Sequence, residues 1–90
     1  MLSFLSKKPT DSMTELKTKF KTRRKTLKFT QKELSQKADV SLGTLKRFEQ
    51  TGQISLEYLL KLAFVLECLE DFGNVCEERE VFESIEEIAG

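Results

Sequence analysis

The sequence predicts an all-α domain of about five helices, and three observations lead to that prediction. A single proline, Pro9, and four glycines leave few helix breakers after the first ten residues. Apolar residues recur at spacings of three and four along most of the chain. Hydroxyl residues suited to helix N-caps precede these periodic stretches, at Ser12, Thr30, Ser41 and Ser55. Ninety residues support one domain with a modest core, which would gain stability from dimerisation.

The first helix is expected from about Met13 to Leu27, after a tail formed by residues 1–11. Ser12 and Glu15 have the spacing of a capping box, which would begin the helix at this point. One apolar stripe at helical spacing then follows the helix: Met13, Leu16, Phe20 and Leu27.

The next two helices are short and closely linked. Thr30 and Glu33 form a second capping-box pattern, which predicts a helix over residues 31–38. A link at residues 39–41 precedes a third helix, which begins at Leu42 and ends near Gln50. Thr51-Gly52 follows, with the glycine suited to the position just after a helix.

The fourth helix begins after Ser55 and is apolar on most sides, so we expect it at the centre of the core. Its stripe comprises Leu56, Leu59, Leu60, Ala63 and Leu66, and Phe64 and Val65 broaden it. A short fifth helix is expected near residues 70–75. The predicted organisation is a tail (1–11), a helical domain (12–76) and an acidic C-terminal segment (77–90). That segment is either an amphipathic helix or a partly ordered strip that contacts a dimer mate or another partner.

The cysteine and histidine content argues against metal and redox chemistry. There is no histidine, and Cys68 and Cys76 lack the CxxC spacing typical of zinc sites. We therefore predict no metal ligands and no cofactor, and two reduced thiols in a reducing compartment. Neither cysteine has a recognisable base partner and no paired acids form a recognisable site, so an enzyme is not expected.

Targeting signals are not recognisable either. The apolar start of the chain is shorter than a signal-peptide core, and its lysines follow the apolar residues instead of preceding them. No apolar run approaches the ~20 residues that a membrane span needs. These features predict a cytoplasmic protein with no membrane partner.

The formal net charge of zero hides a separation of charge along the chain. Residues 1–66 carry 14 Lys or Arg and 6 Asp or Glu, a net charge of +8, whereas residues 67–90 have a net charge of −8. A basic region favours a polyanionic partner. Solvated helix surfaces would give the same composition, so charge by itself leaves the partner open. Eight cations would supply nonspecific attraction to phosphates: Lys17, Lys19, Lys21, Arg23, Lys25, Lys28, Lys32 and Lys37.

Residues 31–50 carry a more specific pattern, two short helices separated by a three-residue turn. They resemble the helix-turn-helix of the Cro/C1-type (XRE) family. The match extends over about residues 22–66 and rests on Arg24, Thr30-Gln31-x-Glu33-Leu34, Ser41, Leu45, Phe48-Glu49, Gly52 and Leu59-x-x-Leu62-Ala63. The resemblance implies a five-helix phage-repressor-like domain. Its third helix would enter the major groove of double-stranded DNA, and its second helix would cross the phosphates.

The resemblance also assigns the DNA contacts. It places Gln31 at a phosphate, where a helix N-terminus suits an anion, with further phosphate contacts from Thr30 and Ser41. Arg47 is the expected base reader, because a guanidinium can donate two hydrogen bonds to guanine. The full predicted set is Thr30, Gln31, Lys32, Ser41, Leu42, Gly43, Thr44, Lys46 and Arg47.

Some of these positions keep alternatives open or depart from the family pattern. Lys46 reaches either a base or a phosphate, and Leu42 either touches a thymine methyl or packs inward. Gly43 stands where a larger reader is usual, costs about 1 kcal/mol of helix propensity, and shifts part of the expected specificity to DNA shape. Asp39 replaces a turn glycine at a left-handed position, which Asp tolerates well. Ser35 replaces the usual alanine where two helices cross.

A structural ion pair is expected between Arg24 and Glu49, as the resemblance implies. Arg24 lies at the edge of an apolar stripe and Glu49 on the inner side of its helix, so each buried charge needs a partner. Arg23 is the alternative partner for Glu49.

These features predict a DNA-binding repressor that acts as a homodimer on a palindromic operator. Residues 48–56 further resemble small HipB-like antitoxins, which repress their own operon and bind a cognate toxin. The alternatives are a stand-alone XRE-type regulator and an interaction adaptor that has lost DNA binding, which Gly43 and the zero net charge favour.

Overall fold

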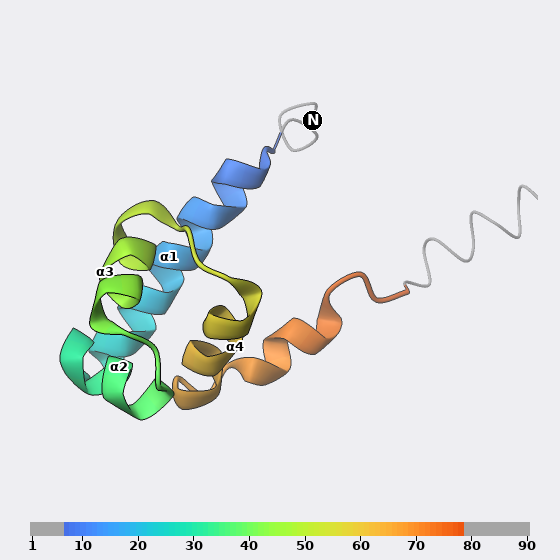
Figure 1. The fold of residues 1–90 in the computed structure, drawn as a ribbon. Helices are drawn as coiled ribbons and strands as arrows, with labels where there is room; N and C mark the ends of the chain where they lie inside the picture. Colours follow the sequence, from blue (N-terminus) through green and yellow to red (C-terminus); the bar gives the residue numbers. More distant parts are fainter. Residues whose placement is uncertain (1–6, 79–90) are drawn as a thin grey trace, which may run out of the picture.

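The computed structural model describes residues 7–78 and contains four α-helices and one 3₁₀-helix in this range, with no strand there (Figure 1). The elements are α1 (Pro9–Thr26), α2 (Gln31–Ala38), α3 (Leu42–Thr51), α4 (Leu56–Val65) and η2 (Leu69–Asn74). The all-α prediction is confirmed, and the fifth helix is present as a 3₁₀-helix. Most of the predicted acidic extension lies outside the described residues.

The start of α1 differs from the prediction. The helix begins at Pro9, so Pro9–Asp11 are helical instead of part of a tail, and Ser12 and Glu15 do not cap it. A proline suits the first position of a helix because its missing N–H would have no partner there. The backbone N–H of Lys8 donates to Oδ2 of Asp11 at 2.8 Å, which holds the first turn.

The boundaries of α2 and α3 follow the predicted local signals. Oγ1 of Thr30 accepts from the Glu33 backbone N–H at 3.0 Å, and the Thr30 N–H donates to Oε1 of Glu33 at 2.8 Å. Oγ of Ser41 accepts from the Thr44 N–H at 3.1 Å. Asp39 takes the expected left-handed conformation, with φ of 55°. The capping chemistry therefore fixes the short link between the two helices.

Gly52 ends α3 for two reasons. Its φ is 81°, a left-handed conformation that favours glycine. A Cβ at this position would also lie 3.0 Å from both Cβ and the carbonyl oxygen of Met13. Glycine therefore lets the end of α3 approach α1 closely.

The core lies between α1, α2, α3 and α4, each of which contributes buried apolar side chains. Its largest fully buried side chains are Phe48, Leu34, Leu45, Leu62 and Leu66. Phe20 of α1 packs edge-on against Phe48, with ring centroids 5.5 Å apart. Ser35 is buried at the helix crossing, and its Oγ donates to the Lys32 carbonyl at 2.8 Å, so the serine needs no other partner.

Only one face of α4 contributes to this core. Leu59, Leu62 and Ala63 are buried, but Leu56 and Phe64 are 67% and 71% exposed. The prediction that both belong to the core stripe is wrong. α4 packs against α2 and η2, and neither element covers the face that carries Leu56 and Phe64.

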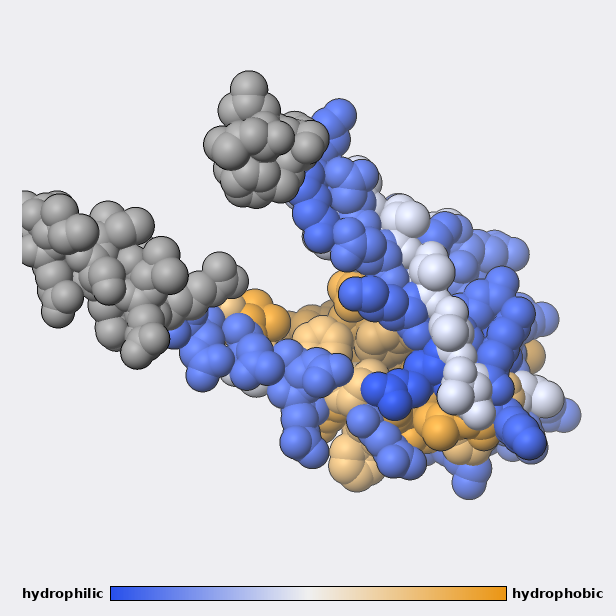
Figure 2. Space-filling view, turned by 180° about the vertical axis from the view of Figure 1, so that it is seen from behind, coloured by the Kyte–Doolittle hydropathy of each residue, from blue (hydrophilic) through white to orange (hydrophobic). Residues whose placement is uncertain are grey.

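On the back of the molecule, α1 and the chain after η2 diverge and leave apolar surface between them (Figure 2). The hollow there has apolar walls from Leu16 and Phe20 of α1 and from Phe72 and Val75 of the C-terminal side. We call it the α1–η2 hollow. Arg23, the alternative partner for Glu49, lines this hollow instead of the core.

Candidate nucleic-acid interface

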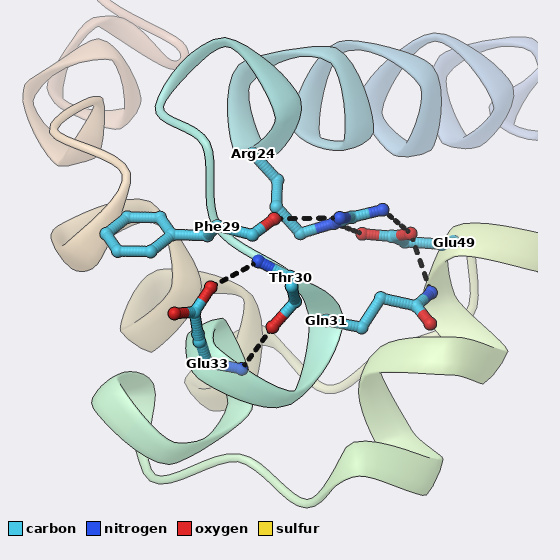
Figure 3. A network of polar contacts seen from close by, with 6 residues as sticks. All are labelled: Arg24, Phe29, Thr30, Gln31, Glu33 and Glu49. Atoms are coloured by element: carbon cyan, nitrogen blue, oxygen red, sulfur yellow. Dashed lines mark hydrogen bonds and ion pairs between the residues drawn. The ribbon is translucent and has the colours of Figure 1, made fainter.

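A buried polar network holds the predicted DNA-binding helices in place (Figure 3). Nε of Arg24 donates to Oε2 of Glu49 at 2.8 Å, and Nη2 donates to Oε1 at 3.0 Å. Nη1 of Arg24 donates to the Phe29 carbonyl at 3.0 Å. The side chains of the pair are only 9% and 4% exposed. Such paired hydrogen bonds satisfy charges that would be costly to bury alone.

Gln31 is part of the same network. Its Nε2 donates to Oε1 of Glu49 at 2.9 Å, so the first residue of α2 is joined to the last turn of α3. The phosphate contact predicted for Gln31 therefore has one side-chain N–H already engaged. The second N–H of that amide and the backbone N–H groups of Gln31 and Lys32 are the donors left for an anion, because the Glu33 N–H already donates to Thr30.

The outer face of α3 presents the predicted readers. Lys46 and Arg47 are exposed, and neither forms an ion pair within residues 7–78. Thr44 is half-buried and its hydroxyl is 2.8 Å from that of Ser41, so these two hydroxyls already bind each other. Leu42 is half-buried too, which leaves both of its predicted roles open.

Gly43 leaves the first turn of α3 without a side chain at this position of the outer face. No atom lies within 4 Å of where its Cβ would be, so packing inside the described chain does not require glycine. The absence of a side chain lets another molecule approach the first turn of α3 closely. The remaining predicted contacts, Thr30, Lys32 and Ser41, are all exposed.

The structure adds residues that the sequence did not indicate. An Nη of Arg47 donates to Oε1 of Gln53, so the guanidinium is bonded to the segment that follows α3. Thr44 and Arg47 also line a shallow hollow with Ser55 and Tyr58 at the start of α4. The predicted N-cap at Ser55 was the sequence signal for this hollow, because the first-turn N–H groups of a helix suit anions. Nothing in the sequence pattern indicated Gln53 or Tyr58.

Lys17 joins α1 to the end of α3. Its Nζ donates to the Gln50 carbonyl at 2.7 Å, where a cation interacts favourably with the helix C-terminus. This contact and the Arg24–Glu49 pair both hold the last turn of α3 against α1. Lys17 is half-buried in this position.

The part of the chain that the structure describes offers no metal-ligating cluster of His, Cys, Asp or Glu. Burial raises the pKa of the Cys68 thiol, so this cysteine is a protonated apolar neighbour of the core and not a reactive thiolate. No helix within residues 7–78 is long and apolar enough to cross a membrane.

A family comparison matches this arrangement. The model of the family described as helix-turn-helix covers residues 20–71, which include α2, α3, α4 and the whole Arg24 network. The chain belongs to the Cro/C1-type helix-turn-helix family. It is a DNA-binding regulator of the XRE type. Comparisons with curated proteins and with solved structures gave no match.

Proposed function

We propose that the chain is a sequence-specific transcriptional repressor that binds a palindromic operator as a homodimer. The observation that supports it most is the exposed outer face of α3. This face carries Lys46 and Arg47, which form no ion pair within residues 7–78, and the Arg24–Glu49–Gln31 network fixes the end of the helix. The major groove of B-DNA admits one such helix. Two copies would place two α3 helices on half-sites about one helical turn apart.

Each predicted contact has a role in this proposal. Arg47 reads guanine with two hydrogen bonds, and Lys46 and Thr44 contact neighbouring bases or phosphates. Around them, the exposed first turn of α2 and the Ser41 cap face the phosphate backbone. The phosphate-facing residues are Thr30, Gln31, Lys32 and Ser41.

Gly43 and Leu42 shape the remaining specificity. Gly43 offers no reader, so the DNA can approach the backbone of α3, and part of the selectivity comes from DNA shape. Leu42 is half-buried and either contacts a thymine methyl or packs inward.

A sharper version of the proposal is an antitoxin that represses its own operon and binds a cognate toxin. The HipB-like passage over residues 48–56 and the acidic segment 77–90 support it. The test is co-purification with the product of the neighbouring gene, with and without residues 77–90. A stand-alone regulator would bind its operator but recover no such partner.

Binding to the promoter of its own gene and to random duplex tests the repressor proposal. Fluorescence anisotropy should show promoter DNA bound at least ~10³-fold more tightly than random DNA. Arg47→Ala should weaken promoter binding by about 1–3 kcal/mol. Arg23→Ala, another exposed arginine but one that lines the α1–η2 hollow, is the matched control and should leave the promoter preference unchanged. Equal, weak binding to both duplexes would instead support the interaction-adaptor alternative.

A further inference from the structure

One face of α4 carries large apolar side chains that no other described element covers. Phe64 is 71% exposed, the highest value among the exposed large hydrophobic residues of the described chain. Leu60 of the same helix is half-buried, and Leu69 just beyond it is 39% exposed. A contiguous exposed apolar patch on a soluble domain is typical of a contact surface.

A hollow lies directly beside Phe64. Ala38 at the end of α2 and Leu60, Val65 and Leu69 form its apolar part, and Phe64 forms one wall. The molecule therefore presents an exposed aromatic ring next to a hollow with apolar walls. A two-fold axis between two copies would let each ring enter the cavity of the other, because the same patch then meets itself.

We propose that this surface, which we call the Phe64 face (Leu60, Phe64, Leu69 and the hollow beside them), binds the same face of a second copy of the chain. The rim of the hollow carries two cations and two anions: Lys37, Lys61, Asp39 and Glu57. Nζ of Lys61 lies 3.8 Å from Oδ2 of Asp39 and 3.9 Å from Oε2 of Glu57. A rim with both signs can pair with its own copy, whereas a rim of one sign would repel itself.

The same charge balance argues against other occupants. A nucleic acid or an acidic protein would favour an excess of cations, such as Lys46 and Arg47 provide on α3. The Phe64 face has no such excess. Its hollow shares no lining residue with the one beside Thr44 and Arg47, so the two surfaces are distinct.

The inference deepens the proposed repressor function and rests on it only for the DNA half-sites. The oligomeric state can be measured without DNA. Sedimentation of the full chain over a wide concentration range should show a dimer that dissociates on dilution. Phe64→Glu should raise the dimer Kd at least tenfold, because it would place a carboxylate in the apolar hollow of the partner.

Val75→Glu is the matched control. Val75 is 65% exposed, similar to Phe64, but it lines the α1–η2 hollow. This variant should keep the wild-type Kd, and circular dichroism should show that both variants fold. The inference is overturned if the wild type is monomeric throughout the range, if Phe64→Glu dimerises like the wild type, or if Val75→Glu dissociates the dimer equally.

DNA binding separates this inference from the proposed function. Phe64→Glu should bind a single half-site with wild-type affinity and lose at least tenfold for the palindrome. Arg47→Ala should weaken binding to both duplexes and leave the dimer Kd unchanged. If the wild type shows no sequence preference but Phe64→Glu still dissociates the dimer, the repressor proposal fails and the dimer surface stands.

Discussion

Nε of Arg24 lies 2.8 Å from Oε2 of Glu49, and the two residues stand 25 positions apart in the sequence. This ion pair joins the last turn of α1 to the last turn of α3, and Gln31 adds the start of α2. This buried polar cluster therefore joins α1, α2 and α3.

Breaking this pair should destabilise the domain strongly. Glu49→Gln leaves the Arg24 guanidinium buried without its counter-ion, and we expect a loss of about 3–5 kcal/mol in the free energy of unfolding. Urea denaturation measures it. The double variant Arg24→Met/Glu49→Leu should cost less than the sum of its two single variants, because it leaves no unpaired buried charge. Additive losses would show that the pair is not coupled.

Alanine substitutions at Gly43 and Gly52 should change the free energy of unfolding in opposite directions. Gly52→Ala should lower the free energy of unfolding by more than about 1 kcal/mol, because an L side chain is strained at φ of 81° and would contact Met13 at 3.0 Å. Gly43→Ala should raise it by up to about 1 kcal/mol, since helix propensity improves and the space is open. Thermal unfolding compares them. A destabilising Gly43→Ala would contradict the open environment assigned to this position.

Gly43→Ala also probes the DNA complex. If the backbone of α3 approaches the groove floor at this position, the added methyl group should weaken operator binding while the domain becomes more stable. Affinity and stability would then change in opposite directions. An unchanged Kd would show that DNA does not reach Gly43.

Stability should fall in acid partly through two exposed glutamates. The Lys7 ammonium, whose Nζ lies 2.8 Å from Oε2, lowers the pKa of Glu15, and the Thr30 backbone N–H lowers the pKa of Glu33. A carboxyl with a lowered folded-state pKa stabilises the fold above its ordinary pKa and loses that contribution as the pH falls through the folded value. The urea midpoint should therefore fall as the pH drops below about 4.3. Glu15→Gln/Glu33→Gln should flatten this decline, and an unchanged profile would count against both contacts.

Phosphate contacts should appear in the salt dependence of binding. Lys32→Ala should weaken binding to all duplexes alike and reduce the slope of log K against log[salt] by about 1. Lys8→Ala is the control, because Lys8 is an exposed lysine at the start of α1 and is not among the predicted DNA contacts. The phosphate role of Lys32 would be excluded if its variant kept the wild-type slope.

Features determined by neighbouring residues could be predicted from the sequence. The Thr30 and Ser41 caps, the left-handed Asp39 and the terminal Gly52 each follow from side-chain chemistry within a few positions. The start of α1 is also determined by neighbouring residues, but the prediction placed it four residues too late. Pro9 counts as a helix breaker in the sequence pattern, whereas in the structure it is the first residue of the helix.

Features that depend on tertiary packing could not be predicted in the same way. The periodicity of α4 places Leu56 and Phe64 near its apolar stripe, but only the positions of α2 and η2 determine which face is covered. The bond from Gln31 to Glu49 likewise joins residues 18 apart, so no local pattern indicates it. The DNA contacts on the exposed face of α3 were predicted only from the family resemblance, and no local pattern indicates them.

Chemical protection of guanine N7 tests most directly whether α3 enters the major groove. An operator selected from random duplexes would be treated with dimethyl sulfate, with and without the protein. We predict protected guanines in two symmetric half-sites about 10 base pairs apart, and loss of protection at one guanine in each half-site for Arg47→Ala. A bound operator whose guanines are methylated as in free DNA, with no change for Arg47→Ala, would contradict recognition by α3.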